Sequence, residues 1–200
     1  MSFTGLQPAL TPHEGPRRWA SSARMFVTSF AGLVLMGTLG FRFTPAMFSG
    51  DGLGWVDSLF MSTSAVCVTG LAIVDLGTYL TPLGQVWLVL LIQLGGLGIL
   101  SLTTLAVARI GRASLSMEEA GGAGPIPLRF VDERDLLRTV VVVTFVVEGT
   151  GALLLWLDWR GRLGAVEALW PAVFHSVSAF CNAGFSLFPD NLVSLRTSPL

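Results

Sequence analysis

Charged residues are scarce in this sequence, and lysine is absent. Asp, Glu and Arg make up 12% of the 200 residues, whereas 52% are hydrophobic. An ordinary soluble domain has about 25% charged residues, so this composition indicates an integral membrane protein that lies in a lipid bilayer. The 12 basic residues, all Arg, nearly balance the 13 acidic ones, which excludes the basic surface typical of nucleic-acid binding. We attribute the missing lysine to the base composition of the coding genome.

Cysteine and histidine are also rare, which argues against a metal or catalytic centre. Cys67 and Cys181 lack the spacing and the neighbouring ligands of a metal site, so no cofactor is expected in this chain. His175 stands near two serines and Cys181, but these residues make no convincing pair of nucleophile and base. We interpret His175 as a packed, hydrogen-bonded side chain and predict that the protein is not an enzyme.

Three uncharged or nearly uncharged segments are long enough to cross a membrane as helices. They are Met25–Phe41, Gly84–Ala108 and Thr139–Leu157, and only Glu148 interrupts the last of them. The first could instead be a signal peptide, but the bulky residues at 41–45 offer no cleavage site. Glu148 is a possible intramembrane polar site, because a carboxyl group there must be paired with neighbouring helices or line a cavity.

An internal repeat organises the chain. When the sequence is shifted by 114 residues, Asp57–Leu71 aligns with Pro171–Phe185, and six of these 15 positions are identical. The identical pairs are Phe60/Phe174, Ser62/Ser176, Ser64/Ser178, Ala65/Ala179, Cys67/Cys181 and Gly70/Gly184. Each copy follows a predicted span, so the repeating unit is a span, a short apolar segment and a second span.

The distribution of arginine favours short segments that enter the membrane and return. In that topology eight Arg share the side of the N-terminal tail and four lie opposite, whereas two crossing segments give seven against five at best. Arginine collects on the cytoplasmic side. The sequence therefore predicts a multi-pass protein of the cell inner (cytoplasmic) membrane with a cytoplasmic N-terminus.

The predicted fold class is an all-α membrane protein of repeated units, each a membrane helix, a pore loop and a membrane helix. A cytoplasmic tail spans 1–24, a complete first unit 25–110, a cytoplasmic linker 111–135, and an incomplete second unit 136–200. Within the linker, Ser116–Glu119 fits a capping box, which indicates either a short surface helix that runs into a turn at Gly121–Pro125 or, as the favoured alternative, a plain solvated connector.

The short segments end in glycine turns, which favour a site for a monovalent cation. A helix that stops inside the membrane leaves carbonyl groups without helical partners, and such oxygens can replace the hydration shell of an ion. We expect the carbonyls at these helix ends to bind the ion. Asp57, Asp75 and Asp190 flank the turns and would attract cations to the outer mouth.

Three strings carry a family resemblance. "TSAVCVTGLAIVDLGTY" (Thr63–Tyr79), "GQVWLVLLIQLGGLGIL" (Gly84–Leu100) and "FHSVSAFCNAGFSLFPDNL" (Phe174–Leu192) resemble the first filter, the following helix and the second filter of the Trk/Ktr/HKT potassium-uptake family. The similarity is greatest to the membrane (pore) subunit of bacterial Ktr systems, and it extends over Met25–Leu200. The glycines at 95, 96 and 98 could suggest a phosphate loop, but inside an uncharged span they predict close helix packing.

The resemblance implies four such units around one pore, a homodimer, and a cytoplasmic ring of nucleotide-binding regulatory subunits. It also implies which residues form the ion-binding selectivity filter: Val68, Thr69, Gly70 and Leu71 in the first unit, and Asn182, Ala183, Gly184 and Phe185 in the second. In this family a filter glycine at the position of Gly70 goes with potassium selectivity. Because four units are expected, we interpret the sequence as an N-terminal fragment or truncated product.

The sequence therefore predicts potassium uptake through a carbonyl-lined filter, either passive or coupled to sodium. Two alternatives stay open at this point. One is a sodium-selective transporter of the same family, and the other is a truncated membrane assembly module that does not transport.

Overall fold

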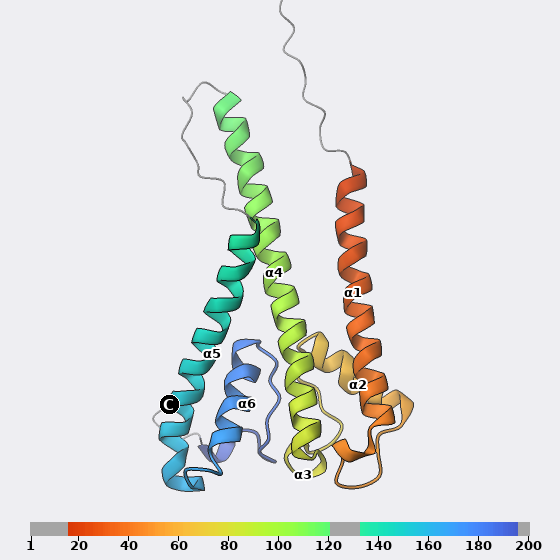
Figure 1. Cartoon of the computed structure of the whole chain (residues 1–200), viewed down its shortest axis with the longest axis vertical. Helices are drawn as coiled ribbons and strands as arrows, with labels where there is room; N and C mark the ends of the chain where they lie inside the picture. Colours follow the sequence, from red (N-terminus) through yellow and green to blue (C-terminus); the bar gives the residue numbers. More distant parts are fainter. Residues whose placement is uncertain (1–15, 121–132, 196–200) are drawn as a thin grey trace, which may run out of the picture.

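The computed structural model describes residues 16–120 and 133–195, which form an all-helical arrangement (Figure 1). Its long helices are α1 (Pro16–Phe43), α4 (Pro82–Ala120) and α5 (Glu133–Leu163). Shorter helices are α2 (Trp55–Val66), α3 (Leu76–Tyr79) and α6 (Leu169–Phe180), with 3-10 turns η1 (Pro45–Met47) and η2 (Val193–Leu195). Helix α4 lies between the α1/α2 pair and the α5/α6 pair.

Each long helix contains one predicted span. The segments long and apolar enough to cross a membrane are Phe26–Phe43, Pro82–Thr104 and Arg134–Leu163. Large apolar side chains such as Val142, Phe145 and Val146 point outward from α5 and are exposed, which suits a helix that faces lipid acyl chains. The chain is therefore a membrane protein built from helices, as its composition predicts.

The ends of two long helices differ from the predicted boundaries. Helix α1 already begins at Pro16, so residues 16–24 of the predicted tail are helical, with proline at the favoured first position. Helix α4 continues to Ala120, so the prediction of a separate short helix at Ser116–Glu119 is wrong. A capping box needs a non-helical first residue, whereas Ser116 lies within the continuous α4. The predicted turn after it lies outside the described residues.

The segment between α1 and α4 leaves and returns at one end of the molecule. Phe48 and Leu80 form an antiparallel bridge, the Ser49 N–H donates to the Tyr79 carbonyl at 2.9 Å, and the Thr81 N–H donates to the Met47 carbonyl at 3.0 Å. The two ends of this segment are thus hydrogen-bonded to each other, and helix α2 lies between them in the chain, beside the lower part of α1 (Figure 1). The short segment therefore does not run through to the opposite end.

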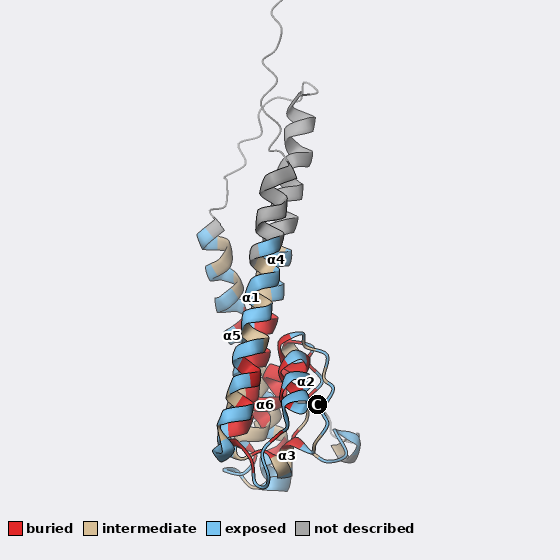
Figure 2. Ribbon diagram, turned by 90° about the vertical axis from the view of Figure 1, so that its right-hand side faces the viewer, coloured by how far each residue is buried: buried red, intermediate tan, exposed pale blue. Residues whose placement is uncertain are grey.

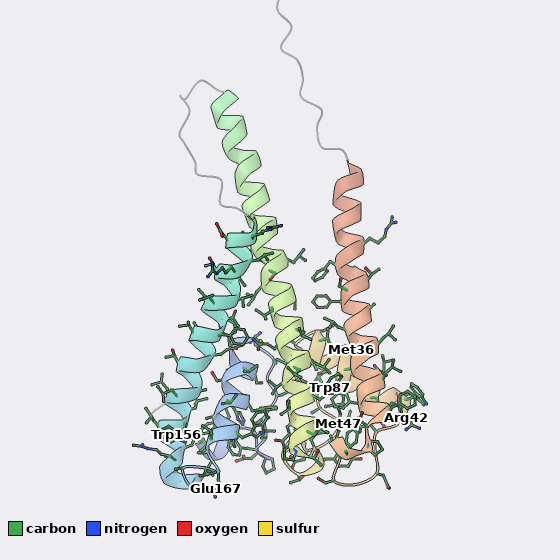
Figure 3. The ribbon with its side chains drawn as sticks, in the orientation of Figure 1. Met36, Arg42, Met47, Trp87, Trp156 and Glu167 are labelled. Atoms are coloured by element: carbon green, nitrogen blue, oxygen red, sulfur yellow. The ribbon has the colours of Figure 1, made fainter. Side chains whose placement is uncertain are left out.

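Buried residues gather where the short helices pack between the long ones. Figure 2 shows them in the lower half of the molecule, around α2 and α6, whereas the described upper parts of the long helices are largely exposed. The fully buried large side chains there include Phe41, Met61, Leu88, Leu91, Ile92 and Phe174. Arg42, Met47, Trp156 and Glu167 lie toward the same end (Figure 3). This core fixes the turns that follow α2 and α6.

Candidate functional site: two glycine turns

The turns after α2 and α6, residues 67–71 and 181–185, are called here the first and second glycine turn. Their helices have the same length of 12 residues and begin and end 114 positions apart. In each turn three successive N–H groups, at 67–69 and 181–183, donate to carbonyls at 63–65 and 177–179 over 2.7 to 3.3 Å. The amides of each turn therefore bind carbonyls of the preceding helix, and the carbonyls expected to bind an ion lie in the residues that follow.

Left-handed backbone conformations recur at matched positions of the two turns. The φ angles are 56° at Val68 and 73° at Gly70, and 58° at Asn182 and 74° at Gly184. Glycine adopts this region without strain, whereas a β-branched residue such as Val68 rarely does. Strained residues of this kind cluster at functional sites, and here they mark every second residue of each turn.

The carbonyl groups of the turns are mostly unbonded. Among the described residues, no hydrogen bond reaches the main-chain oxygens of Val68, Thr69, Gly70, Leu71, Asn182, Ala183 or Gly184. The Phe185 carbonyl differs, because it accepts the Ser178 hydroxyl at 2.8 Å. Seven of the eight sequence-predicted residues thus keep a carbonyl oxygen available for another partner.

The two turns touch each other at their glycines. A Cβ atom placed on Gly70 would lie 2.2 Å from the Ala183 carbonyl oxygen and 3.2 Å from the Gly184 Cα. Gly184 has more room, since the nearest atom to a Cβ placed there is the Gly70 Cα at 3.8 Å. The structure therefore brings both sets of predicted residues together.

A hollow of about 330 Å³ opens over this contact and has a mostly polar lining. Residues of both turns line it, including Gly70, Leu71, Gly184 and Phe185, and Asp75 lies at its wall. The Asp75 carboxylate accepts the Gly77 N–H at 3.0 Å and so caps α3. Of the three flanking aspartates predicted from the sequence, Asp75 is the one that lines the described part of this hollow.

Helix α4 supports both turns through its closely spaced glycines. A Cβ atom would lie 2.1 Å from the Val66 carbonyl if placed on Gly95, and 2.6 Å from the Cys181 Sγ if placed on Gly96. A Cβ atom placed on Gly98 would lie 3.1 Å from the Phe30 ring of α1. These contacts confirm the prediction of close helix packing for this segment.

His175 is a packed and bonded side chain, as predicted. Its Nδ1 lies 2.7 Å from the Pro171 carbonyl and its Nε2 lies 2.9 Å from the Ser186 hydroxyl. A carbonyl only accepts, so Nδ1 carries the proton and Nε2 accepts. The ring also stacks on that of Phe188, with the ring centroids 4.9 Å apart. His175 thereby connects the chain beyond the second turn to α6.

Within residues 16–120 and 133–195, no group of His, Cys, Asp and Glu could hold a metal ion.

Glu148 of α5 is buried, and its carboxylate accepts a hydrogen bond from the Gln93 amide of α4 at 3.0 Å. Sequence reasoning missed Gln93. The signal that could have found it is its position in an uncharged span, where a buried polar side chain needs a partner.

A family profile described as cation transport protein, TrkH, matches residues 4–200. The chain belongs to the TrkH family. It is 36% identical over 178 residues to the Ktr system potassium uptake protein B of Vibrio alginolyticus, covering 88% of this chain and 39% of the relative. Identity to the protein of the same name from Bacillus subtilis is 35% over 158 residues, covering 74% and 33%.

A third relative is the potassium/sodium uptake protein NtpJ of Enterococcus hirae, at 31% identity over 195 residues, covering 91% of this chain and 41% of that protein. The chain thus spans about two fifths or less of the length of these curated relatives. Membership confirms the resemblance seen in the sequence and places the chain in a family of membrane transport proteins.

Proposed function

We propose that the chain forms part of a path for potassium uptake across the cell inner membrane, with the two glycine turns as part of its selectivity filter. The ion-binding groups are the carbonyl oxygens of Val68 to Leu71 and of Asn182 to Gly184. Phe185 belongs to the predicted set, but its carbonyl is shared with Ser178. Conduction is passive or coupled to sodium.

One observation carries this proposal: two adjacent turns with matched left-handed residues present carbonyl oxygens that no other group of the described chain binds. An unbonded carbonyl is costly inside a membrane unless it lines a water-filled space or binds a ligand. Rows of such oxygens can replace the water around a monovalent cation.

The shape of the second unit supports a ring of further units. Gly70 of the first unit packs against the second turn. The matching face of the second unit, around Gly184, instead borders a hollow of about 370 Å³ that Trp159, His175 and Phe185 help to line. A head-to-tail contact that leaves its next face open can extend to further copies, and it forms a ring where the rotation between copies closes. We therefore propose that units of the same kind complete the pore. The resemblance to the membrane subunit of Ktr systems further supports the proposal of a homodimer with a cytoplasmic nucleotide-binding ring.

The orientation follows from charge. In the topology favoured by the sequence, eight of the 12 Arg share the side of the N-terminal tail and four lie opposite, and arginine favours the cytoplasmic side. We therefore place the N-terminus in the cytoplasm and the hollow beside Asp75 at the outer face.

Uptake by cells that lack their own potassium transporters tests the function. The complete native gene should restore growth at limiting potassium and accumulate rubidium, a potassium substitute, in preference to sodium. Preferred sodium uptake would instead identify the sodium-selective alternative. Correct membrane insertion without uptake of either ion would overturn the proposal in favour of an assembly module.

A further inference from the structure

A polar contact lies directly behind the second glycine turn and joins three helical segments. The Gln93 Nε2 of α4 donates to the Glu148 Oε2 of α5 at 3.0 Å. Cys181, the first residue after α6, places its Sγ 3.8 Å from the Gln93 Oε1 and 4.0 Å from the Glu148 Oε1. The contact therefore reaches the residue that precedes Asn182.

Glu148 also holds α6 through its main chain. Its carbonyl accepts the Ser176 hydroxyl at 2.7 Å. A Cβ atom on Gly151, one turn further along α5, would lie 2.5 Å from the same hydroxyl oxygen. Helix α5 is thus seated against α6 at Ser176 and, through Gln93, against the end of α6.

The first glycine turn lacks this arrangement. Val34 occupies the position that corresponds to Glu148 in the repeat. The close approach of Gly37 to the Ser62 side chain, at 3.0 Å, matches that of Gly151 to Ser176. The Ser62 hydroxyl, however, donates within its own helix, to the Ser58 carbonyl at 2.7 Å. The two units therefore have the same close packing of glycine against serine, whereas, among the described residues, the polar contact is found only behind the second glycine turn.

A buried carboxyl group inside a membrane-spanning helix is costly and needs a partner. The Gln93 amide supplies it, and removing either side chain leaves the other with an unsatisfied polar group in surroundings of low polarity. The hydrogen bond between Gln93 and Glu148 therefore fixes the distance between α4 and α5 next to Cys181, which apolar packing alone would leave less defined.

We propose that Gln93 and Glu148 are positioning residues of the second glycine turn and thereby determine ion discrimination, an inference that rests on the proposed function. Gln93 and Glu148 hold Cys181 in place. They thereby determine the positions of the carbonyl oxygens of Asn182, Ala183 and Gly184 relative to the first turn. Neither side chain binds the transported ion in this scheme. Their effect reaches the ion through the position of the turn.

The test compares Glu148→Ala, Gln93→Ala and Glu148→Gln, all expressed from the complete native gene. Each alanine variant should lower the preference for rubidium over sodium by about tenfold, the order expected for a coupled contact. Glu148→Gln should restore the preference, because a glutamine oxygen also accepts from Gln93. The double alanine variant should be no worse than either single variant. Val34→Ala, at the matched position of the first unit, is the control and should leave the preference unchanged.

A second readout does not depend on transport. In a background where Cys67 and any other cysteine of the complete protein except Cys181 are replaced by serine, labelling of Cys181 by a water-soluble maleimide should be slow in the parent, faster in Glu148→Ala, and slow again in Glu148→Gln. Unchanged labelling or unchanged ion preference in the alanine variants would overturn the inference. So would a changed preference in Glu148→Gln, since that result assigns a role to the charge. If the parent transports no ion, the proposed function fails, while the labelling still decides whether the contact positions the turn.

Discussion

The first and second glycine turns share a backbone geometry, but different contacts hold them in place. The first is wedged between main-chain groups, with Gly70 against the Ala183 carbonyl and Val66 against Gly95 of α4. The second is held by polar side chains, since Glu148 and Gln93 lie behind it and His175 binds Ser186 beyond it. The repeated residues thus specify the shape of a turn, and the unrepeated ones specify its support.

Because the two turns are held by different contacts, we expect them to tolerate different kinds of substitution. Main-chain oxygens cannot rotate away from an added atom, so steric changes should harm the first turn more. Hydrogen-bonded side chains lose a discrete interaction when they are replaced, so polar deletions behind the second turn should have graded effects.

The largest effect is expected at Gly70. Gly70→Ala adds a carbon about 2.2 Å from the Ala183 oxygen at a φ of 73°, which combines overpacking with backbone strain. We expect a loss of roughly 3 kcal/mol or more in the free energy of unfolding and a fall of about 100-fold or more in rubidium uptake. Uptake assays and thermal unfolding in detergent measure both.

Gly184→Ala is the matched control for this prediction. The same φ strain applies at 74°, but the nearest atom stands 3.8 Å away, so the loss should be about 1 kcal/mol. Equal effects at the two glycines would show that strain alone decides and that the contact between the turns does not matter.

Much of the fold follows from the sequence, and the reasons are specific. Hydropathy located the three spans, and the matched residues from Phe60/Phe174 to Gly70/Gly184 located two helices that end in the same way. The bond between Gln93 and Glu148 could not be predicted, because it joins residues far apart in the chain and the repeat places an apolar residue, Val34, at the position that matches Glu148. The sequence also did not show that the amides of each turn bind carbonyls of the preceding helix, because it does not give the backbone angles of the turns.

A smaller effect separates Ser64 from Ser178, which occupy matched positions. The Ser64 hydroxyl oxygen accepts the Leu71 N–H at 2.9 Å and the Thr69 hydroxyl at 3.0 Å, whereas the Ser178 hydroxyl donates to the Phe185 carbonyl at 2.8 Å. Ser64→Ala removes two bonds and should cost about 2 kcal/mol, and Ser178→Ala removes one and should cost about 1 kcal/mol. Thermal unfolding of the two variants in detergent checks this order. Equal losses in the two variants would contradict this prediction, because they would show that the second bond to Ser64 does not stabilise the first turn.

The smallest effect concerns the hollow over the turns, where Asp75 of the first unit is the acidic residue among the described lining residues. Asp75 lines the hollow over the turns, and Pro189 stands at its matched position. Asp75→Asn keeps a side-chain oxygen to cap α3 but removes the charge that raises the local concentration of cations. We expect the KM for rubidium to rise about twofold at low ionic strength and the difference to vanish near 1 M inert salt, because the Debye length falls to about 3 Å. A rise in KM that persists at high salt would mean that Asp75 contacts the ion directly, and the first unit would then bind it through a carboxylate as well as through carbonyl oxygens.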